Sequence, residues 1–95
     1  MTPVKISEWD SAQALTTPER IAAYLEVVLE ENDPALIAAA LGDIARAKGM
    51  TKLARETGLT REGLYQALSK DGNPEFVTVL KVLHAFGLRL HASPV

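Results

Sequence analysis

The chain has 95 residues, of which 47% are apolar and 23% charged, and a net charge of −2. This length allows one domain with a single modest core, and the composition is that of an ordinary globular protein. The absence of cysteine excludes disulfides, thiolate zinc sites and cysteine nucleophiles. The longest nearly apolar run, residues 35–42, is far shorter than the roughly 20 residues that cross a bilayer, and no signal-peptide pattern opens the chain, so we expect a cytoplasmic protein.

The charges are unevenly distributed along the chain. Residues 1–41 carry two basic and seven acidic side chains, a balance of −5, whereas residues 42–70 carry six basic and three acidic ones, a balance of +3. This asymmetry favours a basic middle that faces phosphate groups and an acidic N-terminal part that faces away from them or toward a basic protein. An ordinary scatter of solvated charges is the alternative interpretation.

The chain begins with a strand-like pattern and continues into a helix. Apolar and polar residues alternate in segment 2–9, as in a short half-buried strand. A helix is expected to follow, because Thr17 can cap it and Pro18 suits its first position, and it should run to about Glu31. The side chains expected on its buried face are Ile21, Leu25, Val28 and Leu29.

A second helix is predicted over 34–48. Asp33 can cap its start, and Gly49 is suited to end it in a left-handed conformation. Gly42 lies inside this helix at a cost of about 1 kcal/mol relative to alanine, which suggests that a neighbour packs closely there. The side chains expected in the core are Ile37, Ala40, Leu41 and Ile44.

The pattern of residues 51–70 is typical of a helix-turn-helix. A short helix over 51–57 is followed by a turn at Gly58, where a positive φ lets the chain reverse, and Thr60 can cap a second helix that runs to Ser69. The small and apolar residues of this segment fall on the inner faces of the two helices and in the turn. They are Leu53, Ala54, Thr57, Leu59, Leu64, Ala67 and Leu68.

After a loop over 71–74, a last helix is predicted from Pro74 or Glu75 to Phe86, ended by Gly87. Its buried side chains are expected to be Phe76, Val79, Leu80 and Leu83, which leaves Val77, Val82 and Ala85 available for a subunit contact. Leu88, Leu90 and Ala92 then alternate with polar residues. We expect this second short strand to pair with the strand that contains Val4 and Ile6, within one chain or completed across a dimer.

The outward face of the second motif helix carries side chains that can read bases. Gln66 can pair with adenine, Arg61 can pair with guanine or hold a phosphate, and Glu62 can accept from cytosine. Tyr65 can touch a thymine methyl or a phosphate, and residues at both ends of the motif are placed for the DNA backbone. The candidate DNA-binding residues are Thr51, Lys52, Thr60, Arg61, Glu62, Tyr65, Gln66, Ser69, Lys70 and Asn73.

Some of these residues have a simpler interpretation, and the remaining candidate residues predict no catalytic or metal site. Arg61 and Gln66 can also be solvated surface residues, and for Glu62 a helix-surface role is the commoner one. His84 and His91 have no cysteine or paired carboxylate placed to complete a metal site. Because no nucleophile–base–acid pattern and no glycine-rich phosphate loop is found either, we expect no enzyme, no cofactor and no metal.

These motifs resemble two related groups of proteins. Residues 37–86 resemble the Cro and lambda-repressor type of helix-turn-helix, and residues 40–90, with the strings TREGLY and GNP, are similar to the HigA-like addiction-module antidotes. Gly63 departs from the pattern, because it weakens the reading helix and removes one contact side chain. The resemblance implies an all-α, five-helix, lambda-repressor-like domain that comprises residues 1–95.

The same resemblance implies a function. It is that of a DNA-binding antitoxin of a type II toxin–antitoxin module, a homodimer that represses its own operon at a palindromic operator and neutralises a RelE/HigB-like toxin. The alternative is a free-standing prophage-type repressor with no toxin partner. No interaction with a membrane is expected.

Overall fold

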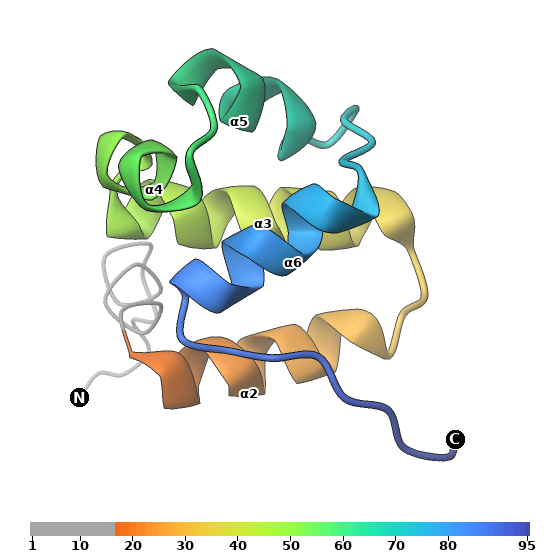
Figure 1. The fold of residues 1–95 in the computed structure, drawn as a ribbon. Helices are drawn as coiled ribbons and strands as arrows, with labels where there is room; N and C mark the ends of the chain where they lie inside the picture. Colours follow the sequence, from red (N-terminus) through yellow and green to blue (C-terminus); the bar gives the residue numbers. More distant parts are fainter. Residues whose placement is uncertain (1–16) are drawn as a thin grey trace, which may run out of the picture.

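The computed structural model describes residues 17–95, and these residues contain five helices and no strand (Figure 1). The prediction of an all-α fold is therefore confirmed for this part of the chain, whereas the strand pattern at 2–9 lies outside the described residues. None of the described helices combines the length and the apolar character that a membrane span requires. The helices are α2 (Pro18–Leu29), α3 (Pro34–Lys48), α4 (Met50–Thr57), α5 (Arg61–Ala67) and α6 (Phe76–Ala85).

The first two described helices begin where the sequence predicts, and side-chain caps are the reason. Thr17 Oγ1 accepts a hydrogen bond from the amide of Arg20 at 3.3 Å. Asp33 Oδ1 accepts from the amides of Ala35 and Leu36 at 3.0 and 3.4 Å. Both caps satisfy amide groups that have no partner within the helix, and a proline follows each cap at the first helical position.

All five helices contribute to one core. α2 packs on α3, while α4 contacts α3, α5 and α6. Leu29, which was predicted to be buried, is instead 45% exposed because it lies in the last turn of α2 at the edge of this contact. The large buried side chains of the core are Ile21, Leu25, Val28, Leu41, Ile44, Met50, Leu53, Leu64, Leu68, Val82, Leu83 and Phe86.

α3 makes two close connections to the elements beside it. Gly42 is buried against the backbone of Leu68, because a β-carbon at position 42 would collide with the Leu68 carbonyl oxygen. The close neighbour expected from the sequence is therefore the chain at the end of α5. At the end of α3, Gly49 (φ +104°) is both the last cap of α3 and the first cap of α4, so one residue joins the two helices.

The buried face of α6 differs from the predicted one. Phe76 and Leu80 are 67% and 40% exposed, whereas Val82 is fully buried and Ala85 is partly buried. The sequence of α6 contains two overlapping apolar stripes, and packing against α4 selects the one made by Val79, Val82, Leu83 and Phe86. The predicted burial of Phe76 and Leu80 and the predicted availability of Val82 and Ala85 for a subunit are therefore wrong.

The chain leaves α6 through a helix-ending motif and then runs extended beside α2 (Figure 1). Gly87 has φ +84°, its amide donates to His84 O, and the amide of Leu88 donates to Leu83 O, both at 2.9 Å. This is the Schellman arrangement expected of a glycine at this position. The predicted strand at 88–92 does not form, since no backbone ladder to another described segment completes it.

Tyr24 lies on the side of α2 that faces α3. Desolvation by partial burial, and secondly the negative charge of Asp43 on α3, raise the pKa of Tyr24 above its ordinary value of 10.0. Both causes act in the same direction, because each disfavours the phenolate. The α2–α3 contact therefore keeps this phenol neutral to a higher pH than an exposed tyrosine.

Candidate nucleic-acid interface

The turn between α4 and α5 is built around Thr57 and Gly58. Gly58 has φ +77°, the left-handed conformation expected of it, and its amide donates to Ala54 O at 2.9 Å. Thr57 Oγ1 donates to Leu53 O at 2.8 Å and accepts from the amide of Leu59 at 3.3 Å. This hydroxyl thus ties the last turn of α4 to the reversing chain, while the Leu59 side chain packs against the core.

α5 begins at the predicted cap and is anchored by two buried leucines. Thr60 Oγ1 accepts from the amide of Gly63 at 2.9 Å, and Leu64 and Leu68 are almost completely buried. A β-carbon at Gly63 would lie 2.9 Å from Thr60 Oγ1, closer than side chains normally approach. The glycine that departs from the family pattern therefore leaves room for the cap of its own helix.

α5 ends at Ala67, two residues before the predicted end at Ser69. The Ser69 hydroxyl donates to Gln66 O at 3.0 Å, and the amide of Gly72 donates to Ser69 O at 2.9 Å. The chain therefore folds back onto the end of the helix. A side chain at position 72 would meet the carbonyl groups of Gln66 and Ala67, which explains the glycine there.

The exposed face of α5 carries the predicted side chains Arg61, Glu62, Tyr65 and Gln66. The Arg61 guanidinium carbon lies 5.5 Å from the centroid of the Tyr65 ring, and Arg61 Nη2 donates to Tyr65 Oη at 3.4 Å. This cation–π contact lays the two side chains along the surface one helical turn apart. α5 occupies one extremity of the molecule in Figure 1, where these residues are open to solvent.

The remaining predicted residues flank this face. Thr51, Lys52, Lys70 and Asn73 are exposed, Thr60 is exposed with its hydroxyl engaged in the cap, and Ser69 is partly buried. Arg55 was missed by the sequence analysis, although its exposed position three residues after Lys52 places both cations on the outer side of α4. That spacing is the signal that could have identified it.

Lys52 and Arg55 on α4 and Arg61 on α5 form no salt bridge within residues 17–95. The salt bridge in that part of the chain joins Arg46 to Asp43 on α3 at 2.8 Å. α4 also differs from α2, α3 and α5 because no side chain of residues 17–95 caps its start, so within this part of the chain the amides of its first turn are available to an anion. No cluster of His, Asp and Glu suited to a metal ion occurs in the described part of the chain.

Comparison with known proteins assigns the chain to a family. A family model described as "probable addiction module antidote protein" matches residues 5–94. The chain belongs to this family. The antidote therefore has a toxin partner of some kind, since an addiction module pairs an antidote with a toxin, and the predicted identity as an addiction-module antidote is confirmed. The narrower HigA-like and Cro-type assignments stay predictions.

The antidote also has a relative of nearly the same length. A protein of Haemophilus influenzae, described as uncharacterized, is 49% identical over 89 residues, which cover 94% of the antidote and 92% of the relative. No solved structure matches the antidote significantly. The similarity therefore extends through both the acidic α2 and the basic α4–α5 segment.

Proposed function

We propose that the antidote is a sequence-specific DNA-binding antitoxin of a type II module, with a HigA-like, lambda-repressor-like fold. It represses its own operon by placing α5 in the major groove of the operator, and it neutralises a RelE/HigB-like toxin. The observation that carries the proposal is the exposed face of α5, where Arg61, Tyr65 and Gln66 project from a helix fixed by the Thr60 cap and by two buried leucines.

α5 and α4 have different roles in this proposal. Gln66 makes a paired donor and acceptor contact with an adenine, and Arg61 contacts a guanine or the adjacent phosphate. Lys52 and the uncapped start of α4 hold a backbone phosphate, and Lys70 and Asn73 hold another beyond the end of α5. The phosphate contacts set the register, and the base contacts set the sequence preference.

The operator is recognised by a homodimer. A single reading helix in each chain requires a second copy to contact two half-sites about 34 Å apart on one face of the duplex. The exposed apolar side chains Phe76, Val77 and Leu80 form one patch on α6 that a second copy would cover. Val77 was expected there from the sequence, and Phe76 and Leu80 replace the buried Val82 and Ala85.

Footprinting on the DNA upstream of the gene, combined with light scattering, tests the DNA-binding role. The expected result is a dimer that protects two inverted half-sites. Replacing Gln66 with alanine should cost about 1 to 3 kcal/mol on the preferred site and relax the base choice at one position of each half-site. A strict monomer without repeated protection, or equal losses on specific and random DNA for Gln66→Ala, would overturn the proposal.

Co-expression with the protein encoded by the neighbouring reading frame tests the toxin half. We expect that protein to arrest growth alone and the antidote to restore growth by forming a complex with it. No complex and no rescue would leave the free-standing repressor as the function of this protein.

A further inference from the structure

α2 presents a strongly acidic surface on the side of the molecule opposite α5. α3 and α6 lie between the two helices, so a molecule bound along α2 does not approach the proposed DNA-reading face (Figure 1). Arg20 is the one basic residue of α2, and no basic residue lies in its last turn. The acidic residues on or directly after the helix are Glu19, Glu26, Glu30, Glu31 and Asp33.

Two of these charges, those of Glu26 and Glu30, act against the stability of α2. Glu26 and Glu30 are one helical turn apart, where like charges repel. Both lie toward the C-terminal end of α2, where the helix dipole favours cations rather than anions. Neither carboxylate forms a salt bridge within the described residues, so no ion pair there offsets this repulsion.

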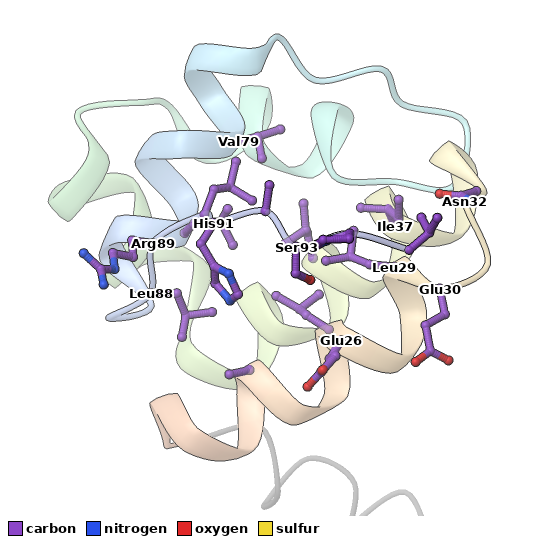
Figure 2. A pocket seen from close by; sticks show the side chains of 18 residues that line it. Glu26, Leu29, Glu30, Asn32, Ile37, Val79, Leu88, Arg89, His91 and Ser93 are labelled. Carbon is purple, nitrogen blue, oxygen red and sulfur yellow. The ribbon is translucent and has the colours of Figure 1, made fainter.

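A groove runs beside these two glutamates, between α2 and the C-terminal segment 88–95. Figure 2 shows Glu26 and Glu30 projecting from α2 at its border, with Leu29, Ile37 and Val79 among the apolar residues that line it. Leu29 is 45% exposed there. The groove thus combines an apolar floor with an acidic border on the α2 side, while Arg89 and His91 belong to the opposite wall.

The segment that forms the other wall has unused hydrogen-bonding groups. Within the described residues, the last backbone hydrogen bond of the chain is the one that Leu88 donates to Leu83 O. From Arg89 onward the extended backbone has no main-chain partner in that part of the molecule. A polypeptide that enters the groove can therefore bond to this wall as well as pack on the floor.

We propose that this groove is the toxin-binding surface of the antidote. Its occupant is a segment of the toxin in which an apolar side chain, seated on Leu29 and Ile37, is flanked by lysine or arginine side chains that pair with Glu26 and Glu30. Charge complementarity with the α2 border assigns basic side chains to the part of the partner that faces Glu26 and Glu30, and the distance from α5 lets the antidote hold its toxin and its operator at the same time. The inference rests on the antitoxin role proposed above.

The test measures binding of the full-length antidote to the protein encoded by the neighbouring reading frame. Glu26→Lys combined with Glu30→Lys should weaken this binding by at least about tenfold, since two charge pairs at the border are reversed. The same change should raise the thermal unfolding temperature, because it removes the repulsion along α2 and places cations at its C-terminal end. A merely structural role for the glutamates predicts the opposite shift.

Two control variants lie on α2 or directly after it, outside the groove. Glu31→Lys reverses one carboxylate, as Glu26→Lys alone does, but Glu31 does not line the groove. Leu29→Ala should also weaken toxin binding because it removes part of the groove floor, and Val27→Ala is its control, since Val27 is an exposed apolar residue outside the groove. Both controls should bind the toxin as the unmodified antidote does. All variants should shift operator DNA equally, which separates a failure at the groove from a failure of DNA binding.

Three results would overturn the proposal. If the neighbouring protein does not bind the unmodified antidote, the groove proposal fails together with the toxin half of the function, while footprinting decides the DNA half separately. If the controls weaken binding as much as the groove variants do, the toxin binds elsewhere and the antitoxin role stands. If the groove variants change the mass of the free antidote in light scattering, the groove is a contact between copies of this chain.

Discussion

The carbonyl oxygen of Leu68 occupies the space that a β-carbon on Gly42 would need, so the middle of α3 and the end of α5 meet backbone to backbone. Gly42→Ala should therefore destabilise the protein by about 1 to 3 kcal/mol through overpacking. Helix propensity alone predicts a gain of about 1 kcal/mol from the same change. Urea denaturation distinguishes the two, and a stabilised variant would show that the contact relaxes freely.

The Thr60 cap offers a second test, in which stability and DNA binding should change together. Thr60→Ala leaves the amide of Gly63 without its acceptor and should cost about 1 kcal/mol of unfolding free energy. Affinity for the operator should fall with it, because the start of the reading helix frays. Thr60→Ser keeps the hydroxyl and is the matched control. Equal losses in both variants would mean that the threonine methyl, rather than the cap, matters.

Lys52 is expected to contribute to DNA affinity without choosing the sequence. Lys52→Ala should weaken binding to specific and random DNA alike, and it should reduce the slope of log K against log salt by about 1. Arg20→Ala, an exposed cation on α2, is the control and should leave the slope unchanged. A slope that does not respond to Lys52→Ala would remove this lysine from the phosphate contacts.

The apolar patch on α6 predicts the oligomeric state. Phe76→Glu should convert the dimer to a monomer and abolish the paired footprint, because a charge at the centre of a buried contact has no partner. The helix should tolerate the change, since an acid suits the first turn. Val27→Glu alters a similarly exposed apolar residue on α2 and should stay dimeric. If both variants dimerise normally, the second copy binds elsewhere.

The raised pKa of Tyr24 predicts how the stability of the protein changes at alkaline pH. Because burial and Asp43 raise this pKa above 10.0, the unfolded chain releases the phenol proton at a lower pH than the folded protein does. The associated stability is complete below pH 10.0 and is lost as the pH rises through the folded pKa. Tyr24→Phe should therefore lose less stability than the unmodified protein above this pH.

Absorbance titration provides a direct measurement of the same group. The chain has two tyrosines, so Tyr65→Phe leaves Tyr24 as the one phenol that titrates. Its midpoint should lie above 10.0. A midpoint at or below this value would contradict the role assigned to the α2–α3 contact.

The elements that the sequence predicts well are those fixed by local interactions. Thr17, Asp33 and Thr60 cap helices that begin where each side chain can reach an amide three residues away or fewer. Gly58 and Gly87 reverse the chain for an equally local reason, the positive φ that each adopts. The exposed face of α5 follows from the inward positions of Leu64 and Leu68.

The features that depend on tertiary packing were not predictable in this way. The sequence of α6 permits two apolar faces, and only the contact with α4 buries Val82 rather than Phe76. Likewise, the alternation of Leu88 and Leu90 is typical of a strand, but a strand also needs a hydrogen-bonded neighbour that the pattern does not supply. Arg55 was not predicted because the expected phosphate contacts lie at the two ends of the motif, whereas Arg55 is an exposed cation in the last turn of α4.

Because Gly49 alone joins α3 to α4, this connection should tolerate changes in length less well than the connection between α5 and α6. An inserted residue there would rotate α4 by roughly 100° about its axis and turn Met50 and Leu53 out of the core. The connection between α5 and α6 comprises residues 68–75 and has no such shared cap, so an insertion after Gly72 would leave α5 and α6 in place. Related chains should therefore vary in length after α5 and keep a constant spacing between α3 and α4.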